Sequence, residues 1–207
     1  MIISTSERVL FVGATGSGKT ELAKRLLRDV RRVLVIDPKH TFALDNFKLR
    51  KSLKVYFWEH KEFRFIVRPQ RGDDNKLRDL LESVFAQGDL TIYVDELASL
   101  ADRFPGTLET LEDIARTGRE RRVSLWNAVQ RPRWTPKIFM TETETFFIYN
   151  LRAEEDRQYM SGFVGAKVAE TRLPQHEFFY CQADANTNPG RMKLNIRTGD
   201  ITRLGEE

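Results

Sequence analysis

Short apolar runs alternate along this chain with segments in which apolar residues recur three and four positions apart. Four runs have the length and composition of buried strands: residues 9–12, 33–36, 90–94 and 123–129. Three segments between them have the spacing of one buried helix face: residues 22–30, 74–87 and 107–121. This alternation predicts an α/β fold with a mainly parallel central sheet flanked by helices.

The other apolar segments predict additions to this core. Residues 53–58, 63–67 and 146–150 are predicted to be further strands, and residues 153–162 a helix. Near the end of the chain, two apolar runs flank the turn-forming residues 186–190, which predicts a C-terminal β-hairpin.

Length and composition indicate one domain. The chain has 207 residues, of which 41% are hydrophobic and 31% charged. We expect a single domain with a core at about 8–160 and an extension at about 161–207. No apolar run is long enough to span a membrane and the N-terminus lacks the pattern of a secretory signal, so the protein is expected to stay inside the cell that makes it.

The strongest chemical motif follows the first predicted strand. Eight consecutive residues satisfy the P-loop pattern G-x-x-x-x-G-K-[ST]: Gly13, Ala14, Thr15, Gly16, Ser17, Gly18, Lys19 and Thr20. Its glycines permit positive φ and let backbone amides approach a phosphate. Lys19 is expected to reach the β- and γ-phosphates, and the hydroxyl of Thr20 to bind Mg²⁺. The motif predicts a site for ATP and Mg²⁺.

Two further strand ends supply the groups that hydrolysis needs. Asp95 and Glu96 follow the strand at 90–94; Asp95 is expected to hold Mg²⁺ through a bound water, and Glu96 to act as general base on the attacking water. Gln130 follows the strand at 123–129. Because parallel strands end at one edge of a sheet, its side chain is expected to contact γ-phosphate or water.

Positive charge is concentrated next to these motifs. The net charge is +4, and residues 116–133 contain six arginines against one acidic residue, Glu120. Such a run is either a solvated helix face or a surface for a polyanion. Trp134 follows it, and either packs on a neighbouring helix or lies beside bound DNA.

The motifs together resemble the FtsK–HerA superfamily of DNA-pumping ATPases. The resemblance covers about residues 8–160 and rests on Asp37-Pro38-Lys39, Asp95-Glu96, Thr117-Gly118-Arg119-Glu120 and Gln130-Arg131-Pro132. It implies a RecA-like (ASCE) P-loop NTPase that assembles as a ring, commonly hexameric, hydrolyses ATP between subunits and moves double-stranded DNA through its centre. It also implies that Gln130 senses the γ-phosphate and that Arg119 acts in trans, with Arg116 or Arg122 as alternatives.

Within that superfamily, a motor of this size without membrane segments or a winged-helix module resembles the genome-packaging NTPases of tailless icosahedral viruses with an internal membrane. This implies packaging of viral double-stranded DNA into a preformed capsid, partners at a capsid vertex or among portal or membrane proteins, and a location in the host-cell cytoplasm or at a virion vertex. The alternatives are another DNA pump of this superfamily, a P-loop kinase and a nucleotide-gated phage assembly protein.

Overall fold

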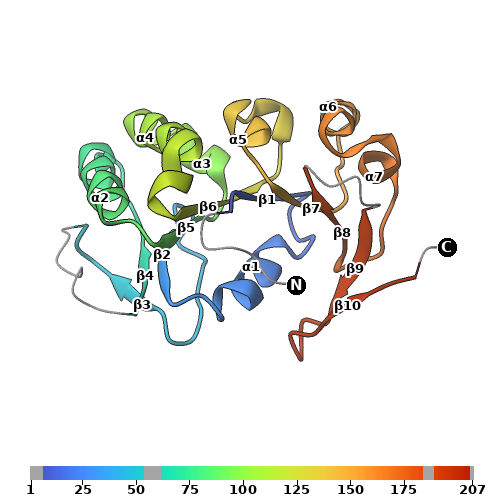
Figure 1. Ribbon diagram of the computed structural model, residues 1–207, viewed down its shortest axis with the longest axis horizontal. Coiled ribbons are helices and arrows are strands. Elements are labelled where there is room, and N and C mark those ends of the chain that lie inside the picture. Colours follow the sequence, from blue (N-terminus) through green and yellow to red (C-terminus); the bar gives the residue numbers. More distant parts are fainter. Residues whose placement is uncertain (1–6, 54–61, 184–188, 206–207) are drawn as a thin grey trace.

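The computed structural model describes residues 7–53, 62–183 and 189–205, in which ten strands form one sheet with the order β10-β9-β8-β7-β1-β6-β5-β2-β4-β3 (Figure 1). The strands are β1 (Val9–Val12), β2 (Arg32–Ile36), β3 (Lys48–Arg50), β4 (Phe63–Val67), β5 (Leu90–Val94), β6 (Val123–Val129), β7 (Thr145–Ile148), β8 (Glu177–Gln182), β9 (Gly190–Leu194) and β10 (Ile201–Arg203). The strands from β7 to β3 along this order are parallel, and β8, β9 and β10 add antiparallel pairs at one end.

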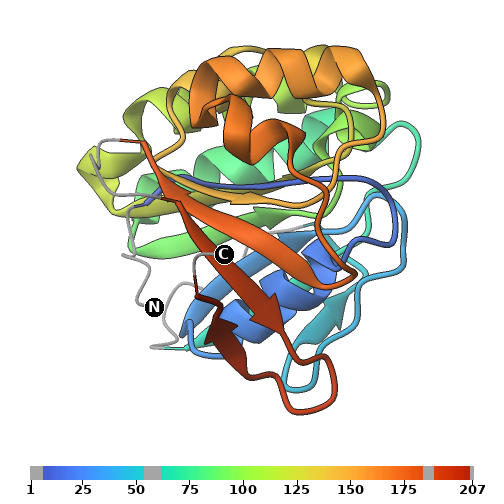
Figure 2. The ribbon, with the colours of Figure 1, turned by 90° about the vertical axis from the view of Figure 1, so that its right-hand side faces the viewer.

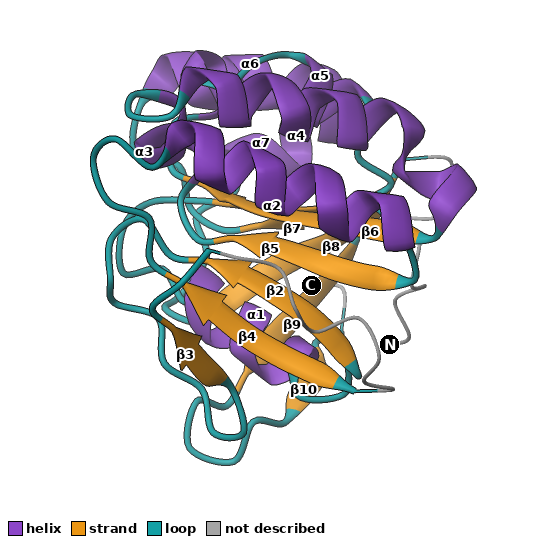
Figure 3. Cartoon of the chain, turned by 90° about the vertical axis from the view of Figure 1, so that its left-hand side faces the viewer, coloured by secondary structure: helices purple, strands orange, loops and turns teal. Residues whose placement is uncertain are grey.

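Helices cover the two faces of the sheet unequally. The helices are α1 (Lys19–Leu27), α2 (Asp74–Gln87), α3 (Leu97–Ala101), α4 (Pro105–Thr117), α5 (Ile138–Thr141), α6 (Glu154–Val164) and α7 (Ala166–Glu170). Helices α2 to α7 lie on one face, and α1 lies on the other (Figures 1 and 3). At the antiparallel end of the sheet, β9 and β10 lie on the same side of the molecule as α1 (Figure 2). No helix in the described ranges is long and apolar enough to cross a bilayer.

Alternating side chains of the central strands produce two cores. In β1, Leu10 and Val12 belong to the core under α2 to α7, whereas Val9 and Phe11 belong to the core around α1. This is the period of two expected for a strand whose two faces are both covered. Phe178 and Leu194 join the α1 core, so the C-terminal strands complete the burial of that helix.

The mainly parallel sheet, the flanking helices and the C-terminal hairpin are confirmed. The predicted helix at 107–121 is α-helical only to Thr117, after which the chain forms the 3-10 helix η1 (Gly118–Arg121). Most of the predicted strand at 53–58 lies outside the described residues. Five short helices and strands have no counterpart among the predictions: β3, α3, α5, α7 and β10. The single domain stays a prediction.

One carboxylate joins α2 to α4. Asp74, in the first turn of α2, accepts hydrogen bonds from the backbone N–H groups of Gly106 (3.0 Å) and Thr107 (2.8 Å) and from the Thr107 hydroxyl (2.7 Å). These amides begin α4, where the helix has no side-chain cap of its own. Desolvation opposes ionisation, but the hydrogen bonds from Thr107 and Gly106 outweigh it and lower the pKa of Asp74. Asp74 therefore caps a neighbouring helix.

Replacing Asp74 by alanine should lower the free energy of unfolding by about 1–2 kcal/mol, the usual cost of losing a helix cap. Chemical denaturation at pH 7 measures this. Because the lowered pKa of Asp74 gives stability that is lost as the pH falls through the folded-state value, the difference from the wild type should narrow below about pH 4. Glu109→Ala removes an exposed carboxylate from the same α4 and should cost less than about 0.5 kcal/mol. Equal losses in both variants would contradict the cap.

Candidate nucleotide site

The P-loop leaves β1 between the ends of two neighbouring strands. The N–H of Gly13 donates a hydrogen bond to the carbonyl of Val129 at 3.1 Å, and the N–H of Ala14 donates one to the carbonyl of Asn150 at 2.8 Å. A Cβ at residue 13 would lie 2.5 Å from the Cβ of Tyr149, so glycine is required by this close approach. The strands beside β1 therefore fix the start of the loop.

The end of the loop leaves backbone donors free for an anion. Gly18 has a φ of 109° and precedes α1 without a side-chain cap. The first amides of a helix have no partner within the helix, so those of Lys19 and Thr20 are available to phosphate oxygens, next to the positive end of the helix dipole. The buried hydroxyl of Ser17 also has no hydrogen-bond partner among the described residues. These features fit a bound phosphate chain.

Lys19 lies inside the loop. Its side chain is 6% exposed, and its Nζ donates to the carbonyls of Gly13 (2.7 Å) and Ala14 (2.9 Å). Desolvation lowers the pKa of Lys19 from 10.5 to about 8, although the nearby carboxylates of Glu96 and Asp95 oppose this change. A lysine held in this way gains by exchanging carbonyl partners for phosphate oxygens.

Thr20 and Asp95 meet as a cation site requires. The Thr20 hydroxyl is 3.0 Å from Oδ1 of Asp95, and the buried Tyr93 hydroxyl donates to the same oxygen at 2.7 Å. A hydroxyl beside a carboxylate is a suitable oxygen donor set for Mg²⁺ held together with nucleotide phosphates. The residues predicted for Mg²⁺ therefore lie in contact, and their chemistry fits that ion.

Glu96 occupies a strained position next to the loop. Its backbone has φ 78° and ψ 81°, a left-handed conformation that costs on the order of 1–3 kcal/mol for a residue other than glycine. The side chain is buried, and its Oε2 lies 3.4 Å from Nζ of Lys39. Strain of this kind often accompanies catalytic positioning, which agrees with the role expected of Glu96.

Gln130 also lies at this edge. It follows β6, and its Oε1 accepts a hydrogen bond from the P-loop hydroxyl of Thr15 at 2.6 Å. The structure thus brings Gln130, Asp95 and Glu96 together with the P-loop. This contact places the side chain of Gln130 beside the P-loop, and its contact with a γ-phosphate stays a prediction.

The arginines 116 to 122 lie at the opposite edge of the sheet, because they precede β6 whereas the P-loop follows β1, which runs parallel to it. At about 3.3 Å per residue, the length of β6 separates the two edges by roughly 20 Å. Arg116 is paired on its own helix with Asp113 (3.0 Å) and Glu112 (3.4 Å). Arg119 is 73% exposed, and its one ion pair among the described residues, with Glu144, is long at 3.9 Å. Arg122 lies 3.8 Å from Asp89. The structure does not bring these arginines to the P-loop of the same chain.

Further along the same chain, Trp134 is 69% exposed. The guanidinium of Arg131 lies 4.1 Å from its ring centroid and forms a 2.7 Å ion pair with the buried Asp156. Arg131 therefore holds the exposed indole beside the end of β6.

Two contributors to the site were not assigned a role from the sequence. Lys39 was noted within Asp37-Pro38-Lys39, but its contact with Glu96 depends on the pairing of β2 with β5. Tyr149 packs against the P-loop, and its hydroxyl lies 3.4 Å from the carbonyl of Gly18. A polar or aromatic residue after a parallel strand is the only feature in the sequence that could have indicated either one.

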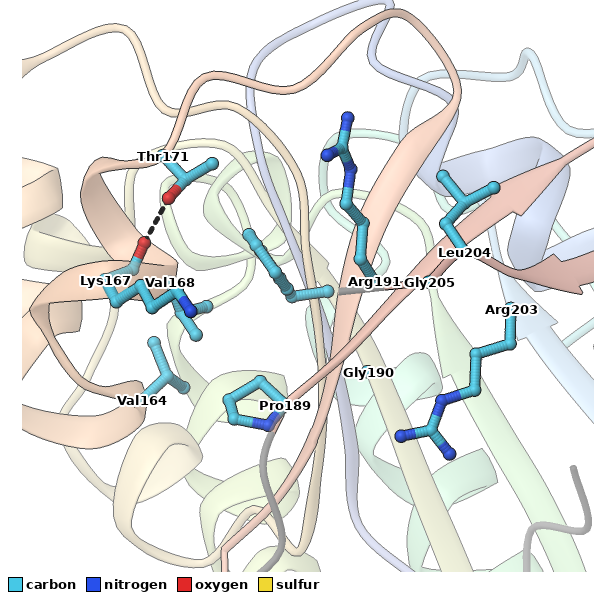
Figure 4. A pocket seen from close by; sticks show the side chains of 11 residues that line it. Val164, Lys167, Val168, Thr171, Pro189, Gly190, Arg191, Arg203, Leu204 and Gly205 are labelled. Atoms are coloured by element: carbon cyan, nitrogen blue, oxygen red, sulfur yellow. Dashed lines mark hydrogen bonds between the residues drawn. The ribbon is translucent and has the colours of Figure 1, made fainter. Parts of the chain in front are cut away.

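A separate pocket lies elsewhere. It has a volume of about 430 Å³ and is formed by α6, α7 and the C-terminal strands, with Val164, Val168, Arg191 and Arg203 in its wall (Figure 4). None of the predicted site residues lines it.

The strand order and the site together define a class of protein. β6 lies between the P-loop strand β1 and the acidic strand β5, with Glu96 after the aspartate and a polar residue after β6. This is the arrangement of a RecA-like P-loop NTPase, as the sequence motifs predict.

Comparison with known proteins narrows this class. No family model matches the chain. Its sequence is 28% identical over 200 residues to the DNA packaging ATPase P9 of Enterobacteria phage PRD1, covering 94% of this chain and 82% of the relative. Its fold is similar to the genome packaging NTPase B204 of Sulfolobus turreted icosahedral virus 2, solved with AMPPCP, with a TM-score of 0.67 at 16% identity over 97% of this chain and 98% of the other.

A third similarity is to the cytoplasmic domain of the Thermomonospora curvata type VII secretion ATPase EccC, with a TM-score of 0.64 and 18% identity over 92% of this chain and 25% of that one. The resemblance inferred from the motifs is thus matched by a viral packaging ATPase in sequence and by a viral packaging NTPase in fold.

Nucleotide affinity should fall as the pH rises above 8. Phosphates favour the charged form of Lys19, so its pKa in the complex exceeds the value of about 8 in the free protein. Binding is then strongest below pH 8 and weakens by about tenfold or more between about pH 7.5 and 9.5. Titration with a non-hydrolysable ATP analogue measures this. Lys24→Gln, which removes a lysine from the same helix, should leave the pH dependence unchanged; a flat profile in the wild type would contradict the lowered pKa.

Proposed function

We propose that this chain is an ATP-hydrolysing motor that packages viral double-stranded DNA into a preformed capsid. The observation that carries this proposal is the sequence similarity, over 94% of the chain, to a phage DNA packaging ATPase. The grouping of the P-loop, Asp95, Glu96 and Gln130 at one edge of the sheet supports hydrolysis by the same chain. Such a motor would act in the host-cell cytoplasm during virus assembly, and its further partners would be capsid-vertex proteins or portal and membrane proteins.

Each site residue has a distinct task in hydrolysis. The P-loop amides and Lys19 hold the β- and γ-phosphates, and Thr20 and Asp95 would hold Mg²⁺, which neutralises charge on those phosphates when bound. Glu96 accepts a proton from water while the water oxygen bonds to the γ-phosphorus and the bond to the β–γ bridging oxygen breaks. Gln130 orients the water or the γ-phosphate. Water is the proposed acceptor because Asp95-Glu96 at a strand end, together with Gly118-Arg119 and Gln130-Arg131-Pro132, resembles the pattern of hydrolysing motors and not that of a kinase.

Arg119 is proposed to complete the site of a neighbouring subunit. It lies at the edge opposite its own P-loop, is largely exposed and has only a distant ionic partner, so its guanidinium is available to another chain. In a ring, commonly a hexamer in this superfamily, one subunit would present its P-loop to the Arg119 of the next. An arginine in that position stabilises charge that develops on the γ-phosphoryl group.

Complementation between two inactive variants tests this arrangement. Lys19→Ala and Arg119→Ala should each reduce ATP hydrolysis by about 10³-fold or more. Mixing them should restore activity, because some interfaces then pair an intact P-loop with an intact Arg119. Arg116→Ala, which removes an arginine already paired on its own helix, should remain active alone. The assignment of Arg119 is wrong if mixing restores no activity. It is also wrong if Arg122→Ala is the variant that loses hydrolysis and regains it on mixing with Lys19→Ala.

Hydrolysis should depend on duplex DNA. We expect DNA to stimulate ATP turnover and to be bound mainly through its phosphates, with exposed groups such as Arg133 and Trp134 near the path of the strand. For about six phosphate contacts, affinity should fall by roughly 10³-fold between about 50 and 200 mM salt. Measured turnover and DNA retention across this range test the proposal.

Glu96→Gln is the control for that experiment. It should keep nucleotide and DNA binding while reducing turnover by about 10²–10⁴-fold, because only the general base is lost. Turnover that ignores DNA in the wild type would contradict the motor. A phosphorylated metabolite without free phosphate would indicate a kinase, and nucleotide-dependent assembly without repeated turnover an assembly protein.

A further inference from the structure

A basic cavity lies at the ends of β2 and β4, and one residue of its wall, Lys39, contacts Glu96. It has a volume of about 640 Å³ and is formed by the turns after β2 and β4 and by α3 with the residues that follow it. Its wall includes Lys39, His40, Arg71, Ser99, Asp102 and Arg103. Three cationic side chains against one carboxylate make it an environment for an anion. We call it the Lys39 pocket.

The turn that carries Lys39 and His40 is held in place by the buried side chain of Asp37. The buried carboxylate of Asp37 accepts the backbone N–H groups of Thr41 (3.1 Å) and Phe42 (3.0 Å), and it pairs with Arg68 at 2.9 Å. Phe42 is fully buried beneath the turn. These contacts preorganise the turn, so a ligand need not order it on binding.

The donors of the pocket suit a phosphate group. Arg71 and Arg103 are exposed at its rim, and Arg71 forms no ion pair with any described residue. Arg103 reaches the carbonyl of Pro38 only at 3.4 Å, which leaves most of its guanidinium donors unused. Guanidinium groups match the oxygens of a phosphodiester, and the hydroxyl of Ser99 adds a neutral donor.

Lys39 connects this pocket to the catalytic edge. Its Nζ lies 3.4 Å from Oε2 of Glu96; the Lys39 side chain is 41% exposed whereas that of Glu96 is 9% exposed. Lys39 thus belongs both to the wall of the pocket and to the contact shell of the general base. While its ammonium occupies Oε2, that oxygen is less available to take a proton from water. An anion in the pocket would compete with Glu96 for this ammonium.

We propose that the Lys39 pocket binds a backbone phosphate of duplex DNA, and that this contact draws Lys39 away from Glu96 and so releases the carboxylate for catalysis. The proposal rests on the proposed function, since it assumes a motor that acts on DNA. It makes Lys39 a positioning residue and the pocket a DNA-contact site. DNA binding and hydrolysis are then coupled within one subunit.

The first test removes the rim of the pocket without touching Glu96. Arg71→Gln with Arg103→Gln should leave DNA-free turnover unchanged and reduce the stimulation by duplex DNA about tenfold. The slope of log DNA affinity against log salt concentration should also become shallower by about one to two, as expected for the loss of about one to two phosphate contacts. Arg31→Gln with Arg78→Gln removes the same charge from exposed positions elsewhere and should match the wild type.

The second test concerns Lys39 itself. Lys39→Gln should raise DNA-free turnover by about fivefold, the scale of a partly exposed ion pair, and should abolish further stimulation by DNA. Lys39→Arg should restore the dependence on DNA. A residue with a merely structural role would instead lower turnover in both conditions, and that result would overturn the proposal.

Four outcomes would count against the motor or the pocket, and the first two separate this inference from the proposed function. If duplex DNA does not stimulate the wild type, the motor itself is wrong. If the wild type responds and the Arg71 and Arg103 double variant responds equally, only the pocket is wrong. If the double variant keeps its response to DNA but loses inhibition by inorganic phosphate, the pocket is a product site; if polyglutamate stimulates as well as DNA does, it is a site for an acidic protein. Either result overturns the DNA contact.

Discussion

The register of four adjacent parallel strands is the constraint on which the site depends. Val12 of β1 is paired with Val129 of β6, Val94 of β5 with Asn127 of β6, and Ile36 of β2 with Val94. The chain therefore leaves each strand at nearly the same level, and the N–H of Asp95 donates to the carbonyl of Ile36 at 3.0 Å. A slip of one residue in β5 would reverse its faces and remove Asp95 from Thr20, because side chains alternate along a strand.

Buried charge makes this register specific. Lys19, Asp37, Asp95 and Glu96 are all buried, and a buried charge is costly unless it is paired. Asp37 is compensated by Arg68, and Lys19 lies in the field of both Asp95 and Glu96. Each of these charges would lose its partner in another register, so the pairs select the functional arrangement even where they add little stability. The strained backbone of Glu96 is retained within the same network.

The sequence predicts the parts of this site that are local. The P-loop and Asp95-Glu96 are contiguous motifs at strand ends, and Gln130 follows from the rule that parallel strands end at one edge. The short elements β3, α3, α5, α7 and β10 were missed because three to five residues are too few for a periodicity to be recognised. The left-handed backbone of Glu96 and its contact with Lys39 arise from tertiary packing, which no spacing along the chain records.

The separation of charges between two edges explains why one subunit alone is an incomplete catalyst in the proposed ring. The arginines before β6 and the P-loop after β1 are separated by the full length of a strand, so no side chain can bridge them within one chain. Lys39, in contrast, approaches Glu96 from the pocket side of its own subunit. The γ-phosphate would then be reached from two directions: by a neighbour's guanidinium, and by a general base that the Lys39 pocket controls. Hydrolysis would require both a correctly placed neighbour and bound DNA, which would limit ATP consumption to motors assembled on their substrate.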